Sequence, residues 1–226
     1  AGAAAATGRS CAGCTRRRSK RSRRLARSTP GAVWANQFDN PANKAFHART
    51  TGAEILAQTG GRLDGFICAA GTGGSLAGIA EALRAAKPDV AIGLADPSGG
   101  ALYRYYTDGV LEAGPGSITE GVGVGRITGN LQDLKVDHAY RIADAEFLPL
   151  LFDLIAHEGL SLAGSAGVNI AGAIRLAETL GSGKTIVTLL CDSGARYAGR
   201  LFDPAYLRAR GLPVPPWCEA GDVEQA

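Results

Sequence analysis

The stretch from Phe66 to Leu83 reads FICAAGTGGSLAGIAEAL, and it changes pattern twice. Its first five residues form an apolar run that is too short for a helix and predicts a buried strand. Its last part predicts a helix, because apolar residues recur at i, i+3, i+4 and i+7: Leu76, Ile79, Ala80 and Leu83. The five residues between the two patterns therefore form a strand-to-helix turn.

This turn is Gly71-Thr72-Gly73-Gly74-Ser75. Glycines allow the backbone to approach a ligand closely, and the free N–H groups and dipole of a helix N-terminus favour an anion. The hydroxyls of Thr72 and Ser75 can add donors. The turn predicts a phosphate site, with a tight connection that binds no ligand as the alternative. The dinucleotide fingerprint G-x-G-x-x-G is not met, because its last glycine would fall at Leu76.

The rest of the chain after about Val33 repeats this alternation of strand and helix. A helix is expected around Ile170, Ile174 and Ala177, ending at Gly181, and a buried helix at 147–155 in spite of Pro149. Further short apolar runs predict strands: Ala91 to Ala95, Ala139 to Ile142 and Thr185 to Leu190. We therefore expect an α/β fold, a parallel sheet with helices on both faces, and ligands at the carboxyl ends of its strands.

Composition sets the class of protein. The chain has 226 residues, 46% of them hydrophobic and 20% charged, which is enough for one large or two small globular domains. We identify no apolar run of the roughly 18 residues that a membrane-spanning helix needs, and no secretory signal. Its five cysteines indicate reduced thiols rather than a disulfide framework. A cytoplasmic location and no membrane partner are expected.

The first 30 residues differ from the remainder. Nine of the 24 basic residues lie between Arg9 and Arg27, and the first acidic residue is Asp39, so 15 basic residues face 21 acidic ones after Arg27. The segment is low in complexity and cannot build a core. We divide the chain into a basic tail, 1–30, and an α/β domain, 31–226. The tail is expected to be disordered or non-native, with a transit segment and a nucleic-acid-binding arm as alternatives.

Several other motifs are incomplete. Gly183-Lys184-Thr185 lacks the first glycine of a P-loop, and no histidine follows Ser165 as a hydrolase nucleophile would require. The pair Cys11 and Cys14 has no partner pair at zinc-binding spacing. The three histidines share no metal-like spacing either: His47, His138 and His157. We expect no metal site.

Six motifs follow one another along the chain: Asn36-Gln37-Phe38-Asp39-Asn40-Pro41-Ala42-Asn43, Thr50-Thr51-Gly52-Ala53-Glu54-Ile55, Gly71 to Ser75, Glu120-Gly121-Val122-Gly123, Gly164-Ser165-Ala166-Gly167 and Asp192-Ser193-Gly194-Ala195-Arg196-Tyr197. In this order they resemble the cysteine synthase and cystathionine β-synthase family of fold type II enzymes that depend on pyridoxal phosphate (PLP). The resemblance runs from about Val33 to about Pro216.

The resemblance implies roles for individual residues. Gly71, Thr72, Gly73, Gly74 and Ser75 would hold the phosphate of PLP, and Gly121 would line the cofactor. Ser193 would bond the pyridine nitrogen, and a neutral partner there favours β-elimination and β-replacement. Gln37 would hold a substrate carboxylate. Ala166 and Ala195 depart from the pattern of many relatives, so substrate contacts at these two positions are not carried over.

The family's Schiff-base lysine and its substrate-carboxylate loop lie before the Asn36 motif, where this chain has only the basic tail. None of its five lysines stands in the family's lysine motif: Lys20, Lys44, Lys87, Lys135 and Lys184. We therefore assign no catalytic residue and expect this chain, a fragment and N-terminally incomplete, not to catalyse the family reaction.

The implied activity of the whole enzyme is PLP-dependent β-replacement on an O-activated serine with sulfide, giving cysteine. A small amino-acid substrate and a homodimer of the full-length form are the implied partners, and a nucleic-acid partner is not expected. The alternative function is a non-catalytic module that binds a phosphate ligand, or nucleic acid through the basic arm.

Overall fold

The computed structural model describes residues 12–218, and the side chains of residues 20–218. Its centre is a four-stranded parallel sheet in the order β3-β2-β1-β4. The strands are β1 (Gly65–Cys68), β2 (Ala91–Pro97), β3 (His138–Ile142) and β4 (Ile186–Val187). The α/β fold with a parallel sheet is confirmed.

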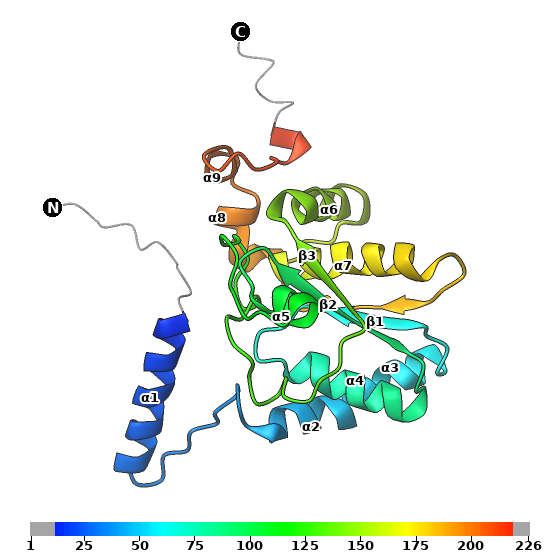
Figure 1. The fold of residues 1–226 in the computed structure, drawn as a ribbon. Coiled ribbons are helices and arrows are strands. Elements are labelled where there is room, and N and C mark those ends of the chain that lie inside the picture. The colour runs from blue at the N-terminus through cyan, green and yellow to red at the C-terminus, as the bar shows by residue number, and fades with distance from the viewer. Residues whose placement is uncertain (1–11, 219–226) are drawn as a thin grey trace, which may run out of the picture.

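Helices cover both faces of the sheet, as Figure 1 shows. On one face lies α4 (Gly74–Ala86), with α2 (Pro41–Arg49) and α3 (Thr51–Thr59) packed against it. On the other face lie α7 (Gly164–Leu180) and α6 (Asp144–Glu158). Neighbouring residues of β1 point to opposite faces, so that Phe66 packs in the α4 layer and Ile67 in the α7 layer.

The predicted helices form, with small differences. The expected end of α7 at Gly181 is confirmed, because this residue has φ of 88° at the C-cap. The helix expected to be buried around 147–155 is only half-buried. Phe147, Leu148, Leu151 and Phe152 face the core, while the other face of α6 is partly exposed.

Two strands end earlier than predicted, and β1 ends at Cys68 rather than Ala70. β4 has two residues instead of the six expected from Thr185 to Leu190. The chain beyond Val187 still runs beside β1, since the Thr188 hydroxyl donates to the Ile67 carbonyl over 2.6 Å. A buried side chain replaces the next ladder bonds, because Asn169 on α7 accepts from the Ala69 N–H and donates to the Leu189 carbonyl. The carboxyl ends of β1 and β4 are thereby fixed to each other.

Residues 12–28 of the basic tail form a helix, α1 (Ala12–Ser28), that stands apart from the body in Figure 1. Alanine, arginine and lysine favour helix, which accounts for local structure in a segment expected to have none. None of the side chains from 20 to 28 is buried, as expected for a segment that cannot build a core. Within the described ranges, no helix is both long and apolar enough to cross a membrane.

The remaining elements are short. α5 (Leu102–Asp108) follows β2, and the C-terminal segment carries η1 (Gly194–Tyr197), α8 (Ala198–Leu201), α9 (Pro204–Arg208) and η2 (Pro216–Cys218). α5 is anchored by Asp96 at the carboxyl end of β2, because the Tyr103 N–H donates to this fully buried carboxylate over 2.9 Å. Burial raises the pKa of Asp96 to about 6, although the N–H groups of Tyr103 and Leu102 and the charge of Arg141 oppose this shift.

We expect this buried acid to make stability depend on pH. The native state holds a proton on Asp96 more tightly than the unfolded chain does. The stability that this proton contributes is therefore lost as the pH rises from about 4 to about 6. Relative to Asp96→Asn, the free energy of unfolding of the chain should fall by up to about 3 kcal/mol between pH 4 and pH 7. Urea unfolding of both proteins across this range measures it. Parallel pH profiles would contradict the expectation.

Candidate functional site

The turn Gly71–Ser75 lies where the sequence predicts it, after the carboxyl end of β1, and its last two residues form the start of α4. Gly73 is the N-cap of α4, with φ of 83°, a conformation that suits glycine. The Gly74 N–H donates to the Thr72 Oγ1 over 3.3 Å. Among the described residues, the N–H groups of Gly71, Thr72 and Gly73 have no hydrogen-bond partner. The half-buried turn therefore presents free donors, as an anion site requires.

A second glycine segment lies against this turn. A Cβ atom on Gly71 would overlap the carbonyl oxygen of Gly121, so the two backbones meet without a side chain between them. The Gly123 N–H also donates to the Ala70 carbonyl over 3.1 Å. The structure thus brings Gly121 into contact with the glycine turn. The sequence singles out both as candidate site positions.

Gln37 lies on the other side of the turn. Its side chain is exposed, and its backbone is held by the amide of Asn43, which donates to the Gln37 carbonyl over 2.8 Å and to the Thr72 Oγ1 over 3.1 Å. The same Asn43 side chain fills the space that a Cβ on Gly74 would need. Gln37 is therefore next to the turn, with its amide free to face a ligand.

Ser193 follows β4 at the same edge of the sheet. It pairs with Leu162 in an isolated β-bridge, and it is the N-cap of η1, where its Oγ accepts from the Ala195 N–H over 3.3 Å. Since Asn169 fixes the ends of β1 and β4 to each other, Ser193 and the glycine turn leave neighbouring strands. In the described part of the chain, no hydrogen bond joins Ser193 to the turn directly.

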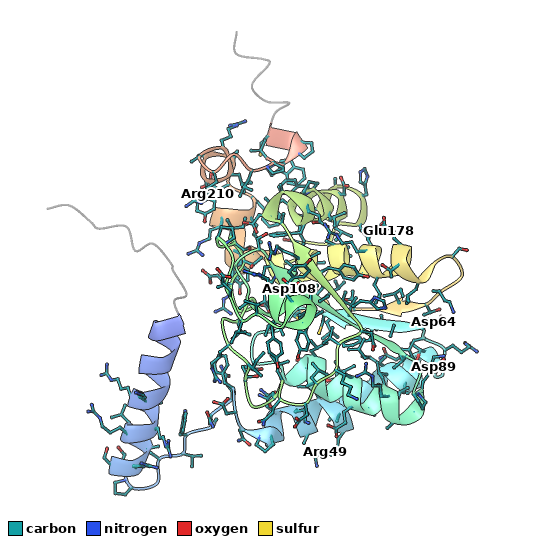
Figure 2. The ribbon with its side chains drawn as sticks, viewed as in Figure 1. Arg49, Asp64, Asp89, Asp108, Glu178 and Arg210 are labelled. Carbon is teal, nitrogen blue, oxygen red and sulfur yellow. The ribbon has the colours of Figure 1, made fainter. Side chains whose placement is uncertain are left out.

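Three of the five lysines are held in ion pairs away from this edge. In Figure 2, Asp64 and Asp89 lie together at the right-hand side of the molecule, beside the amino ends of β1 and β2. Two lysines are bound there, and a third is bound by a residue in the second half of α4. The ion pairs are Lys184 with Asp64 (3.1 Å), Lys87 with Asp89 (3.4 Å) and Lys44 with Glu81 (3.2 Å).

His47 is the histidine that touches the turn. Its Nε2 lies 3.3 Å from the Ser75 Oγ, and its Nδ1 lies 3.0 Å from the Thr51 Oγ1. The ring therefore links α2, α3 and α4. No group of three or more histidine, cysteine, aspartate or glutamate side chains that could hold a metal ion occurs in residues 20–218.

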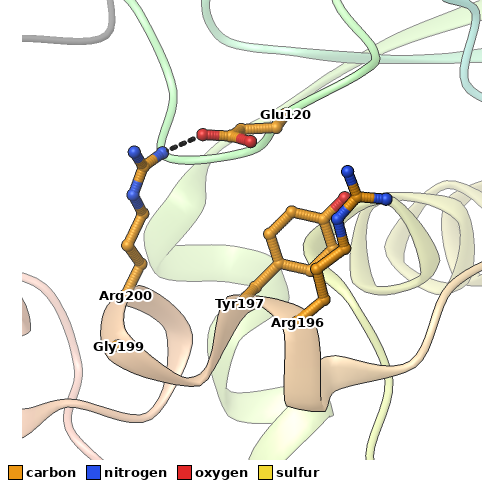
Figure 3. Close-up of a pocket in the computed structure, with 5 residues that line it drawn as sticks. All are labelled: Glu120, Arg196, Tyr197, Gly199 and Arg200. Carbon is orange, nitrogen blue, oxygen red and sulfur yellow. Dashed lines mark hydrogen bonds and ion pairs between the residues drawn. The ribbon is translucent and has the colours of Figure 1, made fainter.

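A hollow of about 310 Å³ lies beside Glu120, where Figure 3 shows Arg200 in an ion pair with this carboxylate. Arg196, Tyr197 and Gly199 complete its wall. The hollow is lined by the segments that carry Gly121 and Ser193, but by neither of these residues. It therefore lies next to the glycine turn and does not contain it.

Sequence reasoning did not identify the polar residues that hold the site together. Asn169, Asn130 and Thr128 are each at most 2% exposed, and all three bond the backbone of a site segment. The sequence pattern could have revealed Asn169, since it is a polar residue on the apolar face of α7. Asn130 and Thr128 lie in an irregular loop, where no periodicity could distinguish them.

Cys68 ends β1 beside these segments. Burial raises the pKa of its thiol, so it remains protonated near neutral pH and is a poor nucleophile.

We expect the contact between Gly71 and Gly121 to be intolerant of any side chain. Gly71→Ala should lower the free energy of unfolding by about 1–3 kcal/mol, because the two loops must separate. Gly199→Ala is the matched control, since a Cβ there meets nothing within 4 Å, and it should stay within about 0.5 kcal/mol. Chemical denaturation of both variants tests this, and equal stabilities would contradict it.

Comparisons with known proteins identify a family and several similar chains. The family described as "Pyridoxal-phosphate dependent enzyme" matches residues 4–192, beginning inside the basic segment and upstream of the motifs. "Cysteine synthase 1" of Emericella nidulans is 47% identical over 197 residues, 85% of this chain and 53% of that protein. Its namesake in Neurospora crassa is 46% identical over 84% of this chain and 52% of that protein.

A solved structure, the O-acetylserine dependent cystathionine β-synthase of Helicobacter pylori, superposes with a TM-score of 0.71 at 31% identity. The superposition covers 79% of this chain and 56% of that one. The chain spans about half the length of the relatives it matches. With its parallel sheet, its glycine turn and these matches, the chain belongs to the family of pyridoxal-phosphate dependent enzymes, among relatives named cysteine synthase.

Proposed function

We propose that this chain supplies the cofactor-binding part of an enzyme that makes cysteine from an O-activated serine and sulfide. The observation that carries the proposal is the set of free N–H groups at Gly71, Thr72 and Gly73, at the start of a 13-residue helix. Together with the helix dipole, such donors stabilise a dianionic phosphate. The names of the relatives, cysteine synthase and O-acetylserine dependent cystathionine β-synthase, support the substrate class.

The residues present fit PLP. Gly71 to Ser75 would hold its phosphate, and the backbone of Gly121 would border it at the point where a side chain on Gly71 is excluded. When bound, PLP supplies an electron-withdrawing ring that eases loss of the α-proton and of the β-substituent of an amino acid. The protein supplies binding, orientation and hydrogen bonds.

Ser193 would orient the ring. Its Oγ accepts from the Ala195 N–H, so its own O–H proton remains available to donate. A neutral hydroxyl donor suits an unprotonated pyridine nitrogen, whereas a carboxylate would keep that nitrogen protonated. A neutral partner at the ring nitrogen would favour β-replacement, in which the activated oxygen substituent leaves the β-carbon and sulfide takes its place.

Gln37 would bind the substrate carboxylate. Its side-chain amide offers two N–H donors, and its backbone is fixed next to Thr72 through Asn43. A carboxylate held there would place the amino acid against the cofactor.

We assign no catalytic residue to this chain. A positioned amine of lowered pKa is required for the family chemistry, and three of its lysines are held in ion pairs away from the turn. The homodimer and the cytoplasmic location expected from the sequence stay predictions.

The proposal predicts that the chain prefers PLP to pyridoxal, which lacks the phosphate. Equilibrium dialysis should give at least a tenfold weaker affinity for pyridoxal, and inorganic phosphate should compete with PLP but not with pyridoxal. Ser193→Ala should weaken PLP binding roughly threefold to tenfold through loss of one hydrogen bond, and leave phosphate binding unchanged. Equal affinities for PLP and pyridoxal would exclude a phosphate site at the glycine turn.

We also predict the outcome of borohydride reduction in the presence of PLP. No single lysine should be trapped in high yield, because none is positioned at the turn. Peptide mass spectrometry of the reduced chain measures this. High-yield trapping of Lys44 or Lys135 alone would show that another amine takes the role, and that the chain can react.

The alternative, a nucleic-acid-binding module, has one specific observation in its favour. The described part of α1 carries exposed cations that make no ion pair within residues 20–218: Lys20, Arg21, Arg23, Arg24 and Arg27. If this helix binds nucleic acid, affinity for a duplex should fall steeply with salt and be lost when residues 1–30 are removed. Fluorescence anisotropy at two salt concentrations measures it. We expect only weak, non-specific binding.

A further inference from the structure

Three consecutive residues contact both sides of the candidate site. Thr128 Oγ1 donates to the Thr72 carbonyl over 2.7 Å. The Asn130 amide donates to the carbonyls of Gln37 over 2.9 Å and Phe38 over 3.0 Å. Gly129, between them, donates its N–H to the Asp39 Oδ1 over 2.9 Å. The segment 128–130 thus joins the glycine turn to the Gln37 segment.

The bond to Thr72 determines where the next N–H points. In a trans peptide the C=O and the following N–H are antiparallel, so a Thr72 carbonyl directed at Thr128 directs the Gly73 N–H the opposite way. Asn130 also lies 3.3 Å from the same carbonyl. The peptide plane between Thr72 and Gly73 is therefore held with its free donor facing away from the 128–130 segment.

The Gln37 carbonyl is held on two sides. It accepts from Asn130 over 2.9 Å and from Asn43 over 2.8 Å, which uses both of its lone pairs. Asn43 in turn bonds the Thr72 Oγ1. Two amide side chains from different parts of the chain therefore fix Gln37 in one position relative to Thr72.

An ion pair supports the same contact. Arg126 binds Asp39 in a bidentate manner, with nitrogen–oxygen distances of 2.9 and 3.0 Å. The hydrogen bond from Arg126 is the largest cause that lowers the pKa of Asp39, and the Gly129 N–H adds to it. The carboxylate is therefore charged at neutral pH and keeps the Gly129 N–H engaged.

Burial makes these bonds hard to replace by water. Thr128 and Asn130 are each 1% exposed. If the glycine turn or the Gln37 segment moved away from residues 128–130, these buried side chains would lose hydrogen bonds, and that loss is more costly than the loss of an exposed bond. The two loops should therefore move together.

From this geometry we propose that Thr128 and Asn130 are positioning residues that lock the glycine turn and the Gln37 segment into one rigid unit. Given the proposed function, this unit sets the distance between the cofactor phosphate and the substrate carboxylate. An anion that binds the turn is thereby coupled to the segment that receives the substrate. Thr128 and Asn130 themselves touch neither ligand.

NMR relaxation of the ¹⁵N-labelled full chain tests the lock without any ligand. In Asn130→Ala, backbone order parameters at residues 37–40 and 72–73 should both fall from about 0.85 to below about 0.6. Gln132→Ala, which truncates an exposed amide two residues away, should leave both sets unchanged. Unchanged values at either loop in Asn130→Ala would overturn the proposal.

Titration with inorganic phosphate tests the coupling. In the unaltered chain, amide signals of the turn and of residues 38–39 should shift together. In Asn130→Ala the turn signals should still shift, with at least about fivefold weaker affinity, while those of residues 38–39 stay still. Shifts at both loops in the variant would refute the lock and leave the phosphate site standing. If no turn signal shifts in the unaltered chain, the phosphate site fails, and the ligand-free order parameters alone decide on the lock.

Thr128→Val provides a second variant if Asn130→Ala does not fold. It keeps the shape of the side chain and removes the shorter of the two hydrogen bonds to the Thr72 carbonyl. Order parameters at residues 72–73 should fall, and phosphate affinity should weaken at least about threefold. A variant with unchanged dynamics and unchanged affinity would overturn the proposal.

Discussion

The close approach of Gly71 to the Gly121 carbonyl is the constraint on which the site depends. It lets the loop that carries Gly121 and Thr128 close over the carboxyl end of β1, and only a residue without a side chain permits it. Asn169 adds the second fixed point by bonding Ala69 and Leu189, so that the ends of β1 and β4 cannot separate. Parallel pairing of β1 with β4 then places the glycine turn and Ser193 at one edge of the sheet.

Charge at this edge is arranged to leave the glycine turn without a competing side chain. Asp39 is neutralised by Arg126, and Glu120 pairs with Arg200 in the neighbouring hollow. Three lysines are engaged in ion pairs away from the turn. The donors at the turn are therefore backbone N–H groups, which bind an anion through geometry and the helix dipole.

The elements that follow strong local patterns could be predicted from the sequence. β1, α4 and the turn between them have a strand period, a helix period and glycines in order, and the structure contains all three. β4 was predicted too long because Thr188 and Asn169 replace its ladder bonds, a tertiary effect with no local signal. The roles of Thr128 and Asn130 were missed for the same reason. Helix propensity in a segment without a core accounts for α1, which composition alone suggested would lack structure.

A crystal structure of the chain with PLP tests the central claim most directly, since it shows where the phosphate binds. The account predicts phosphate oxygens within about 3 Å of backbone nitrogens in the turn from Gly71 to Ser75, with the ring directed toward Ser193. A phosphate bound instead between Arg196 and Arg200, with the turn unoccupied, would contradict it.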